Sequence, residues 1–584
     1  MTDATNGNRS YMFQQDLQPV GDSLALSALC GAVPLLALFV LLGGLRMKAW
    51  LAGVISLVVA LLVAITLFDM PIGQALLAAT EGATFGFFPI LWIVINAIWV
   101  YNLTVASGHF DVLRRSFERV SPDQRVQAII IAFCFGALLE ALAGFGTPVA
   151  ITVVMLMALG FQPMKAAVVA LVANTAPVAF GALATPIVTL GTVTSGASDD
   201  PRLNTETLGA MVGRQTPLLA LVVPLILVLI VDGRRGIRNA WLPAVVCGAA
   251  FAVAQFVAAN YISVPLTDII ASLVSAGAVV LLVRVWSPAE VLTAEPVEVR
   301  EPGAVPAGAR PRGGGASAGS GSTAGAGDLT DPDHHDSGAD IARAYAPYLV
   351  IIAIFSITNI TAVKEKLAQE PWTTIFAWPG LDVHNAAGDP VATTDFTLNW
   401  LPAAGTLMIL AGIITALILR VRPGTAARTY VTTYVELRSA IVTVMAVLAL
   451  AYVMNLSGQT GSLGAWLAQA GAAFAILSPI IGWLGVAVTG SDTSSNALFG
   501  ALQVQTAQQA GLDQVLMAGS NSSGGVLGKM VSPQNLAIAA AAVGLAGREG
   551  DIFRKVIGWS LVLLAAMCVI VWLQSTPVLS WMVP

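Results

Sequence analysis

Two short polar motifs interrupt apolar sequence in the first half of this chain, Gly144-Phe145-Gly146-Thr147-Pro148 and Asn174-Thr175-Ala176-Pro177. The second half carries matching motifs, Gly490-Ser491-Asp492-Thr493-Ser494 and Asn521-Ser522-Ser523-Gly524. In both halves a Gly follows the Asn by seven residues, and a Pro follows it by twelve. Matched interruptions of this kind are typical of membrane proteins that are built from two repeats and bind a ligand where the repeats meet.

The composition places the chain in a membrane. Of its 584 residues 56% are hydrophobic and only 10% are charged, whereas an ordinary soluble domain has about 25% charged residues. A net charge of −5 gives no indication of nucleic-acid binding. The four cysteines lie in apolar runs without the spacing of metal ligands, so we expect reduced core residues and no metal site.

Many apolar runs reach the roughly 20 residues that cross a bilayer. We expect about 12 full spans and two shorter apolar pairs, near 126–161 and 474–509, that form re-entrant hairpins. If the hairpins span the membrane instead, we expect about 14 crossings with the same orientation. The full spans are expected near 24–44, 49–68, 85–105, 166–194, 216–231, 241–259, 263–285, 345–361, 401–420, 430–456, 515–545 and 556–574.

The positions of basic residues set the orientation. Most of the 28 Lys and Arg residues fall on the cytoplasmic side when both termini are placed outside. In that topology the span 85–105 runs inward and its counterpart 430–456 runs outward, so the two repeats are inverted. We therefore predict an all-α polytopic membrane protein with two inverted repeats and broken helices. No cleavage site precedes the first span, so we expect no cleaved signal peptide.

The pattern divides the chain into seven regions. They are a tail with the first two spans (1–84), the first repeat (85–215), connecting spans (216–286), a flexible cytoplasmic linker (287–343), spans with an outer loop (344–429), the second repeat (430–548), and a final span with its tail (549–584). The linker is rich in Gly, Ala and Ser and cannot bury a core. We expect no metal site at its His334-His335 pair.

The polar motifs supply groups that suit a carboxylate. Thr147, which precedes Pro148, is expected to cap a new helix, and Thr493 with Ser494 is expected to do the same. Asn174 and Pro177 are expected to break one span, and Asn521, Gly524 and Gly525 the other. Each break leaves N–H groups at a helix start, where an anion is stabilised. The alternative is that the small residues serve close helix packing.

Charged residues within apolar spans indicate which further side chains could belong to the functional site. Each costs about 2.5–3.5 kcal/mol on the insertion scale, so each is a functional candidate. Lys529 follows the second break and is suited to attract an organic anion; the alternative is an ion pair with Asp492. Asp492 and Glu140 are candidates for a coupling proton, because burial favours a neutral carboxyl. Asp492 is preferred, because Glu140 is also placed to brace the first hairpin.

The predicted substrate-binding residues are Thr147, Asn174, Thr175, Thr493, Ser494, Asn521, Ser522, Ser523 and Lys529, and the predicted proton-coupling residues are Asp492 and Glu140. The stretch 524–530 resembles a phosphate loop, but its spacing is wrong and Met530 stands where Ser or Thr is required. No metalloprotease motif or nucleophile elbow is present. We therefore expect a carrier without a cofactor, neither an enzyme nor a pump. A channel is the alternative class, because re-entrant loops also build filters.

The same motifs resemble those of the bacterial L-lactate permeases, in the lactate and glycolate symporter family. The residues that carry the resemblance are 135–140, 144–151, 174–181, 211–215, 490–499, 528–530, 532–535 and 581–584. The resemblance covers nearly the whole chain outside 287–343. It implies uptake of L-lactate, or of glycolate or D-lactate, together with a proton across the bacterial cytoplasmic membrane. It also implies kinship with transporters that move as an elevator.

Three alternatives to this implied function stay open. The carrier could take a different organic anion, its coupling ion could be sodium, or the protein could be an anion channel. An oligomer in the bilayer is compatible with every one of these readings.

Overall fold

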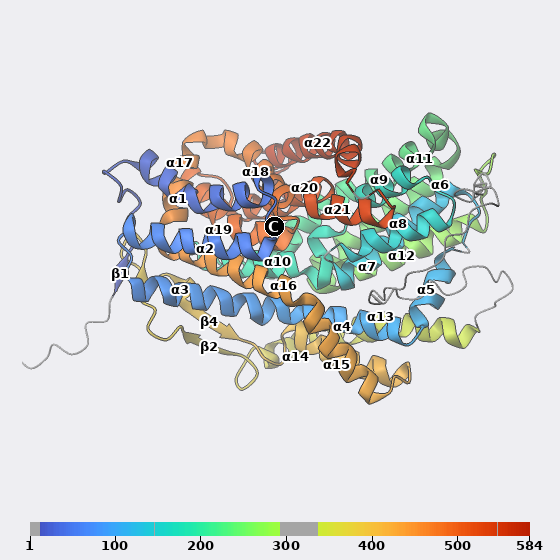
Figure 1. The fold of residues 1–584 in the computed structure, drawn as a ribbon, viewed down its shortest axis with the longest axis horizontal. Coiled ribbons are helices and arrows are strands. Elements are labelled where there is room, and N and C mark those ends of the chain that lie inside the picture. The colour runs from blue at the N-terminus through green and yellow to red at the C-terminus, as the bar shows by residue number, and fades with distance from the viewer. Residues whose placement is uncertain (1–11, 119, 145, 293–336, 546) are drawn as a thin grey trace, which may run out of the picture.

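The computed structural model describes residues 12–118, 120–144, 146–292, 337–545 and 547–584. Helices make up nearly all of its regular structure, with four short strands at one end of the molecule (Figure 1). The first half holds α1 (Leu24–Phe39), α2 (Ala49–Thr66), α3 (Ile72–Phe85), α4 (Trp92–Ala106), α5 (His109–Glu118), α6 (Gln124–Gln127), η3 (Ala128–Phe135), α7 (Gly136–Ala143), α8 (Thr147–Ala158), α9 (Pro163–Ala173), η4 (Val178–Phe180), α10 (Gly181–Thr194), α11 (Thr205–Val257) and α12 (Thr267–Val283).

The second half continues in the same way. It holds α13 (Gly338–Thr358), α14 (Thr361–Leu367), α15 (Ala404–Ile418), α16 (Pro423–Leu456), α17 (Gln459–Leu467), α18 (Phe474–Thr489), α19 (Asp492–Ala510), α20 (Gln514–Gly528), η9 (Lys529–Val531), α21 (Pro533–Ala542) and α22 (Glu549–Gln574). The remaining short helical turns are η1 (Val40–Gly44), η2 (Gly86–Leu91), η5 (Ala258–Ile262), η6 (Val264–Leu266), η7 (Ala392–Thr394), η8 (Ala468–Ala473) and η10 (Ser580–Met582). Most of the linker expected at 287–343 lies outside the described residues.

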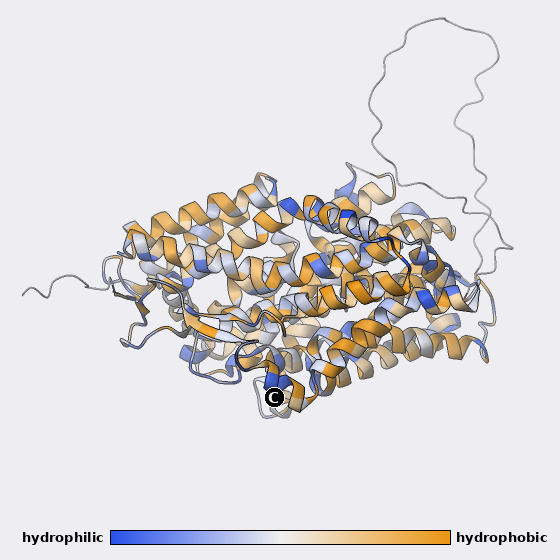
Figure 2. Cartoon of the chain, turned by 90° about the horizontal axis from the view of Figure 1, so that it is seen from below, coloured by the Kyte–Doolittle hydropathy of each residue, from blue (hydrophilic) through white to orange (hydrophobic). Residues whose placement is uncertain are grey.

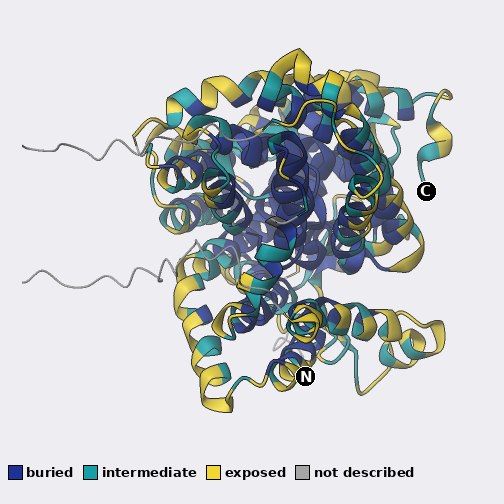
Figure 3. Cartoon of the chain, turned by 90° about the vertical axis from the view of Figure 1, so that its right-hand side faces the viewer, coloured by how far each residue is buried: buried dark blue, intermediate teal, exposed yellow. Residues whose placement is uncertain are grey.

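The helices are long and apolar enough for a multi-pass membrane protein. Among the described residues ten helices meet the length and hydropathy of a membrane span, or eleven when the bent pair Pro163–Ala173 and Val178–Thr194 counts as one. Large apolar side chains stay exposed on the outer helices, such as Leu62 of α2, Leu417 of α15 and Val562 of α22. Figure 2 shows hydrophobic residues along the whole length of the helices, whereas Figure 3 shows buried residues gathered in the middle of the bundle. Such an outer surface suits contact with lipid.

Helix α11 folds back on itself. Asp232 and Gly233 leave the helical conformation, with φ of +60° at Gly233, a value that Gly adopts readily. A Cβ on Gly248 would lie 2.6 Å from the carbonyl oxygen of Leu221, so the two arms of α11 pack in direct contact. The segments expected as spans 216–231 and 241–259 therefore lie antiparallel to each other. The two arms form one continuous helical stretch, Thr205–Ile262, so two of the 12 expected spans lie in a single helix of the structure.

The first hairpin, η3–α7 followed by α8, begins and ends at one end of the molecule. Gln124 Nε2, before its first arm, donates to the carbonyl oxygen of Leu159, after its second arm, at 3.2 Å. Arg125 pairs with Asp232 at 3.1 Å, and Lys165 Nζ donates to the carbonyl oxygen of Val231 at 2.7 Å. Both ends of this hairpin therefore lie beside the fold-back of α11.

The second hairpin, α18 followed by α19, begins and ends at the opposite end. Ser478 of α18 donates to the carbonyl oxygen of Met517 in α20 at 3.2 Å. Asp513, between α19 and α20, pairs with Arg202 at 3.0 Å, just before α11 begins at Thr205. The first arm of α11 separates Arg202 from Asp232, so the two hairpins point toward each other from its two ends.

The short strands join the amino-terminal segment to the loop 362–399. The strand β1 (Phe13–Gln14) pairs in parallel with β3 (Val383–His384), and β2 (Thr374–Ala377) pairs in an antiparallel way with β4 (Asp395–Leu398). The amino-terminal segment and this loop therefore lie at the same end of the molecule (Figure 1).

Candidate functional site

An ion pair joins the two halves of the chain at the centre of the bundle. Lys529 Nζ, in η9 after α20, lies 2.5 Å from Glu140 Oε1 in α7. Glu140 is 2% exposed and Lys529 is 6% exposed. Removing either charge would leave the other buried without compensation, which is strongly unfavourable. The sequence allowed an ion pair for Lys529 with Asp492; the partner in the structure is Glu140, from the opposite repeat.

Asn174 and Gly181 complete the surroundings of Glu140. Asn174 Nδ2 donates to Glu140 Oε2 at 3.0 Å, while its own Oδ1 has no partner among the described residues. A Cβ on Gly181 would lie 2.8 Å from Glu140 Oε1, so only Gly leaves room for the carboxyl group there. The carboxyl group of Glu140 is thus held by Asn174 and Gly181 on one side and by Lys529 on the other.

That broken segment has an irregular backbone. Helix α9 ends at Ala173, as the sequence predicted, and the chain bends by 65° before it continues. The next helix contains three consecutive residues in the left-handed region, Ala182, Leu183 and Ala184, with φ of 44°, 56° and 58°. Non-glycine residues rarely adopt this conformation, and clusters of such residues gather at functional sites.

The second polar cluster surrounds Asp492, in the first turn of α19. Ser522 Oγ donates to Asp492 Oδ2 at 2.5 Å. Asn496 Nδ2 lies 3.5 Å from the same oxygen. Asp492 Oδ1 has no partner in the part of the chain that the structure describes, and a Cβ on Gly525 would collide with it. The carboxyl group of Asp492 therefore packs directly against Gly525 of α20, which has no side chain, as Glu140 packs against Gly181.

Amide side chains connect this cluster to the first repeat. Asn521 Nδ2 donates to Asn496 Oδ1 at 2.8 Å, and Asn521 Oδ1 accepts from Gln503 at 3.1 Å. Asn496 Nδ2 donates in turn to the carbonyl oxygen of Pro186 at 3.0 Å. Pro186 follows the irregular turn of α10, so the broken segment of one half is bonded to the hairpin of the other.

The tips of both hairpins lie against the start of α21. A Cβ on Gly146, at the tip of the first hairpin, would collide with Ile538 and lie 3.3 Å from Asn535 Oδ1. A Cβ on Gly490, at the tip of the second, would lie 2.7 Å from Gln534 Oε1. The two tips therefore reach neighbouring residues of one helix, within the same cluster as Lys529.

Two details of the predicted site are wrong. The second break is not at Asn521, Gly524 and Gly525, because α20 stays helical to Gly528 and the break falls at 529–532. Gly524 lies against the backbone of Pro479 in α18, so these glycines serve close packing and do not interrupt the helix.

The predicted caps are also shifted. Gly146, with φ of 84°, is the cap residue of α8, and Thr147 is its first helical residue without a capping bond. The second cap is Ser491, whose Oγ accepts from the backbone N–H of Ser494 at 3.2 Å. Thr493 and Ser494 lie inside α19.

The other predicted binding residues differ in their partners. Thr175 Oγ1 donates to the carbonyl oxygen of Val172 at 2.6 Å and is occupied by its own helix. Ser523 Oγ is buried and has no partner among the described residues. Thr147 is half-buried at the first tip. Among the described residues, the buried atoms of this cluster without a hydrogen-bond partner thus include Ser523 Oγ, Asn174 Oδ1 and Asp492 Oδ1.

Two buried carboxyl groups escaped the sequence interpretation. Asp268, in the first turn of α12, is fully buried and accepts from Gln255 Nε2 at 2.9 Å. Glu81, in α3, is fully buried, and neither of its oxygens has a partner in the described part of the chain. Asp268 is a single charge within the expected span 263–285, which was the signal that selected Glu140, whereas Glu81 falls between the expected spans 49–68 and 85–105.

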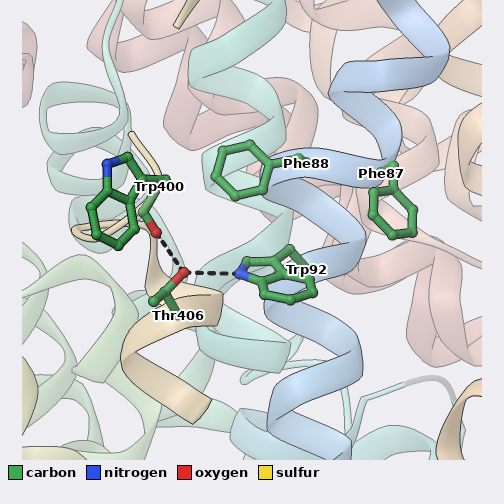
Figure 4. Close-up of a pocket in the computed structure, with 5 residues that line it drawn as sticks. All are labelled: Phe87, Phe88, Trp92, Trp400 and Thr406. Atoms are coloured by element: carbon green, nitrogen blue, oxygen red, sulfur yellow. Dashed lines mark hydrogen bonds between the residues drawn. The ribbon is translucent and has the colours of Figure 1, made fainter. Parts of the chain in front are cut away.

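An apolar pocket lies elsewhere on the molecule (Figure 4). It has a volume of about 390 Å³ and is lined by Phe87, Phe88, Trp92, Trp400 and Thr406. Thr406 Oγ1 accepts from Trp92 Nε1 at 3.0 Å and donates to the carbonyl oxygen of Trp400 at 2.6 Å. Glu140, Lys529, Asp492 and their partners do not line this pocket. Its two hydrogen bonds join Thr406, at the start of α15, to Trp92 of α4 and to Trp400 in the loop before α15.

Comparison with known proteins places the chain. A family model described as L-lactate permease matches residues 27–578. The chain belongs to the L-lactate permease family. The L-lactate permease of Escherichia coli (strain K12) is 39% identical over 98% of this chain and 100% of its own length. That of Bacillus subtilis (strain 168) is 39% identical over 98% of this chain and 99% of its own length.

A second named activity occurs among the relatives. The glycolate permease GlcA of Escherichia coli (strain K12) is 40% identical over 96% of this chain and 98% of its own length. The relatives of this family are thus permeases and not enzymes. The crystal structure of the Alcanivorax borkumensis YdaH transporter aligns with 82% of this chain and 84% of its own, at 12% identity and a TM-score of 0.41, which is too low to support an argument.

Proposed function

We propose that the protein is a secondary carrier that imports L-lactate and related 2-hydroxymonocarboxylates, glycolate and D-lactate among them, with a proton across the bacterial cytoplasmic membrane. The names of the relatives support lactate and glycolate as substrates. The observation that carries the proposal is the buried ion pair of Lys529 with Glu140, because it offers a cation for a carboxylate and a carboxyl group for a proton.

Charge balance explains why the substrate and the proton would enter together. Without substrate, the Lys529 ammonium is neutralised by the Glu140 carboxylate. A proton on Glu140 removes that negative charge, and the carboxylate of the substrate takes its place beside Lys529. The site is neutral in both states, whereas substrate without a proton would add an uncompensated buried charge, which is costly.

The free atoms around the pair suit a 2-hydroxyl group. Asn174 Oδ1 lies on the side chain whose Nδ2 binds Glu140, and it can accept a hydrogen bond from the hydroxyl. Ser523 Oγ and the half-buried Thr147 supply further polar contacts. The remaining members of the proposed substrate site, which surround these groups and hold its helices, are Thr175, Thr493, Ser494, Asn521 and Ser522. Asp492, with one free oxygen, is the second candidate for the proton.

The bonding between the halves also supports a moving unit. The two hairpins, α9–α10 and α20–α21 are tied together by the Glu140–Lys529 and Asn496–Pro186 contacts. We propose that the hairpins are re-entrant and that this unit moves as an elevator against α2, α3 and α16. Those three helices pack together in an apolar cluster that also takes in residues of α19, so this cluster holds the contact between the two units.

Reconstituted vesicles test the proposal. Uptake of L-lactate, D-lactate, glycolate and propionate should be measured in proteoliposomes under a proton gradient, a sodium gradient, or neither. We expect saturable uptake and counterflow of the 2-hydroxy acids, with accumulation only under the proton gradient. Accumulation driven by sodium alone would replace the proton as the coupling ion. Linear flux without counterflow would assign the protein to the channels.

A further inference from the structure

Asp268 is a buried carboxyl group that the proposed exchange at Lys529 does not use. It lies in the first turn of α12 and is fully buried. Its Oδ1 accepts one hydrogen bond, from Gln255 Nε2 at 2.9 Å, and its Oδ2 has no partner among the residues that the structure describes. One neutral donor does not compensate an ionised carboxylate in a dry site. Asp268 therefore holds a proton in this arrangement.

Gln255 links Asp268 to the broken segment of the first repeat. The Nε2 group of Gln255 also lies 3.4 Å from the carbonyl oxygen of Ala176. Ala176 is two residues beyond Asn174, which donates to Glu140. Gln255 is itself fixed, because its Oε1 accepts from Thr216 Oγ1 at 3.3 Å. Gln255 thus ties Asp268 to the backbone of the segment whose Asn174 bonds Glu140.

The two carboxyl groups lie on neighbouring helices. Helix α12, which carries Asp268, packs against α7, which carries Glu140. Lys529 pairs with Glu140 and supplies the single cation of this cluster. Two carboxylates that share one cation in a dry site cannot both be ionised at low cost, so one of them keeps a proton.

The position of Asp268 along α12 suggests where its proton comes from. Ser263, just before η6 and α12, accepts from Asn359 Nδ2 at 3.2 Å, and a Cβ on Gly209 would lie 2.9 Å from Val264 Cγ1. Gly209 is in the first turns of α11, close to Arg202. Asp268 therefore lies between Glu140 and the end of the bundle that carries Arg202 and Asp513, which the basic residues place outside.

We propose that Asp268 is a second proton site in the membrane, which delivers a proton to Glu140 when the substrate carboxylate approaches Lys529. In this step the O–H bond on Asp268 breaks and an O–H bond forms on Glu140. Asp268 then regains a proton from the solution at the outer end of α12. One proton enters for each exchange, and no other reactant is needed. The inference rests on the proposed proton symport and adds a residue to its path.

An isosteric variant separates this role from a structural one. Asp268→Asn keeps the size of the side chain and an oxygen that accepts from Gln255, but it cannot carry a proton. We expect proton-driven accumulation of L-lactate in proteoliposomes to fall by about tenfold or more, as for a lost proton-transfer group, while counterflow persists. Asp268→Glu should restore part of the accumulation. Asp389→Asn, in an exposed loop, is the matched control and should behave as the unchanged protein.

The outcomes distinguish this inference from the proposed function. If the unchanged protein shows no proton-driven accumulation, the proposed symport is wrong. If the unchanged protein accumulates L-lactate and Asp268→Asn accumulates it equally well, Asp268 is a brace for Gln255 and the inference alone is overturned. Loss of counterflow together with accumulation in Asp268→Asn also overturns it, because that result assigns the residue to substrate binding or folding.

Discussion

Lys529 Nζ lies 2.5 Å from Glu140 Oε1, although the two residues are 389 positions apart in the chain. The pair is almost completely buried, and Asn174 holds the second oxygen of Glu140 at 3.0 Å. In the proposed exchange the affinity for an anion and the affinity for a proton are coupled through this one contact, because the proton and the anion each replace one partner of the same ion pair.

Removing one partner of the Lys529–Glu140 pair should reduce the stability of the protein more than removing both partners. Lys529→Met or Glu140→Gln alone should destabilise the protein by about 3–5 kcal/mol, because each leaves a buried charge without its partner. The double variant should regain much of that stability and still fail to transport. Thermal unfolding in detergent, read beside vesicle uptake, measures both. Single variants as stable as the unchanged protein would show that the pair is solvated in the membrane.

Asn174 should set the preference for a 2-hydroxyl group. Its Oδ1 has no partner among the described residues and belongs to the side chain that bonds Glu140, so Asn174→Ala should weaken L-lactate relative to propionate by about tenfold, the worth of one hydrogen bond. Competition of both acids for labelled L-lactate uptake measures the ratio. Thr175→Ala is the control, since the Thr175 hydroxyl is bonded to Val172 of its own helix. An equal change in both variants would remove Asn174 from substrate recognition.

The sequence predicted the elements of this site better than their contacts. The matched motifs located both hairpin tips and the first break, because Gly and Pro act on the local backbone and their effect can be seen in the residues themselves. The sequence offered only Asp492 as an ion-pair partner for Lys529, and the pairing with Glu140 could not be predicted because it depends on how the two repeats are placed in space.

The second break was misplaced for a related reason. A glycine in an apolar segment can serve close helix packing without interrupting the helix, and Gly524 and Gly528 lie against the backbone of α18. Their effect depends on a neighbouring helix that local sequence does not reveal. The Asp268–Gln255 contact is of the same kind, since its two residues lie on different helices.

The two candidate carboxyl groups can be separated by coupling assays. Asp492→Asn and Glu140→Gln should each be tested for accumulation and for counterflow, which needs no net proton movement. A proton carrier should lose accumulation and keep counterflow. We expect this result for Glu140→Gln, because its charge balances Lys529, while Asp492→Asn should retain coupling if Asp492 only orders Ser522. Normal accumulation in both variants would contradict both assignments.

Substitution of Gly181, which faces Glu140, should reduce transport as strongly as removal of the charge of Glu140. A methyl group at Gly181 would lie 2.8 Å from Glu140 Oε1 and 3.1 Å from its Cγ, so Gly181→Ala must push the carboxyl group away from Lys529. Uptake should fall to the level of Glu140→Gln, although no charged or polar group is removed. Gly558→Ala in α22 is the matched control, because nothing lies within 4 Å of its added Cβ and Ala favours a helix. Initial uptake rates at equal membrane expression give the comparison. If Gly181→Ala transports L-lactate with unchanged kinetics, the position of Glu140 against Lys529 is not critical for transport, and the exchange between proton and substrate at this pair is wrong.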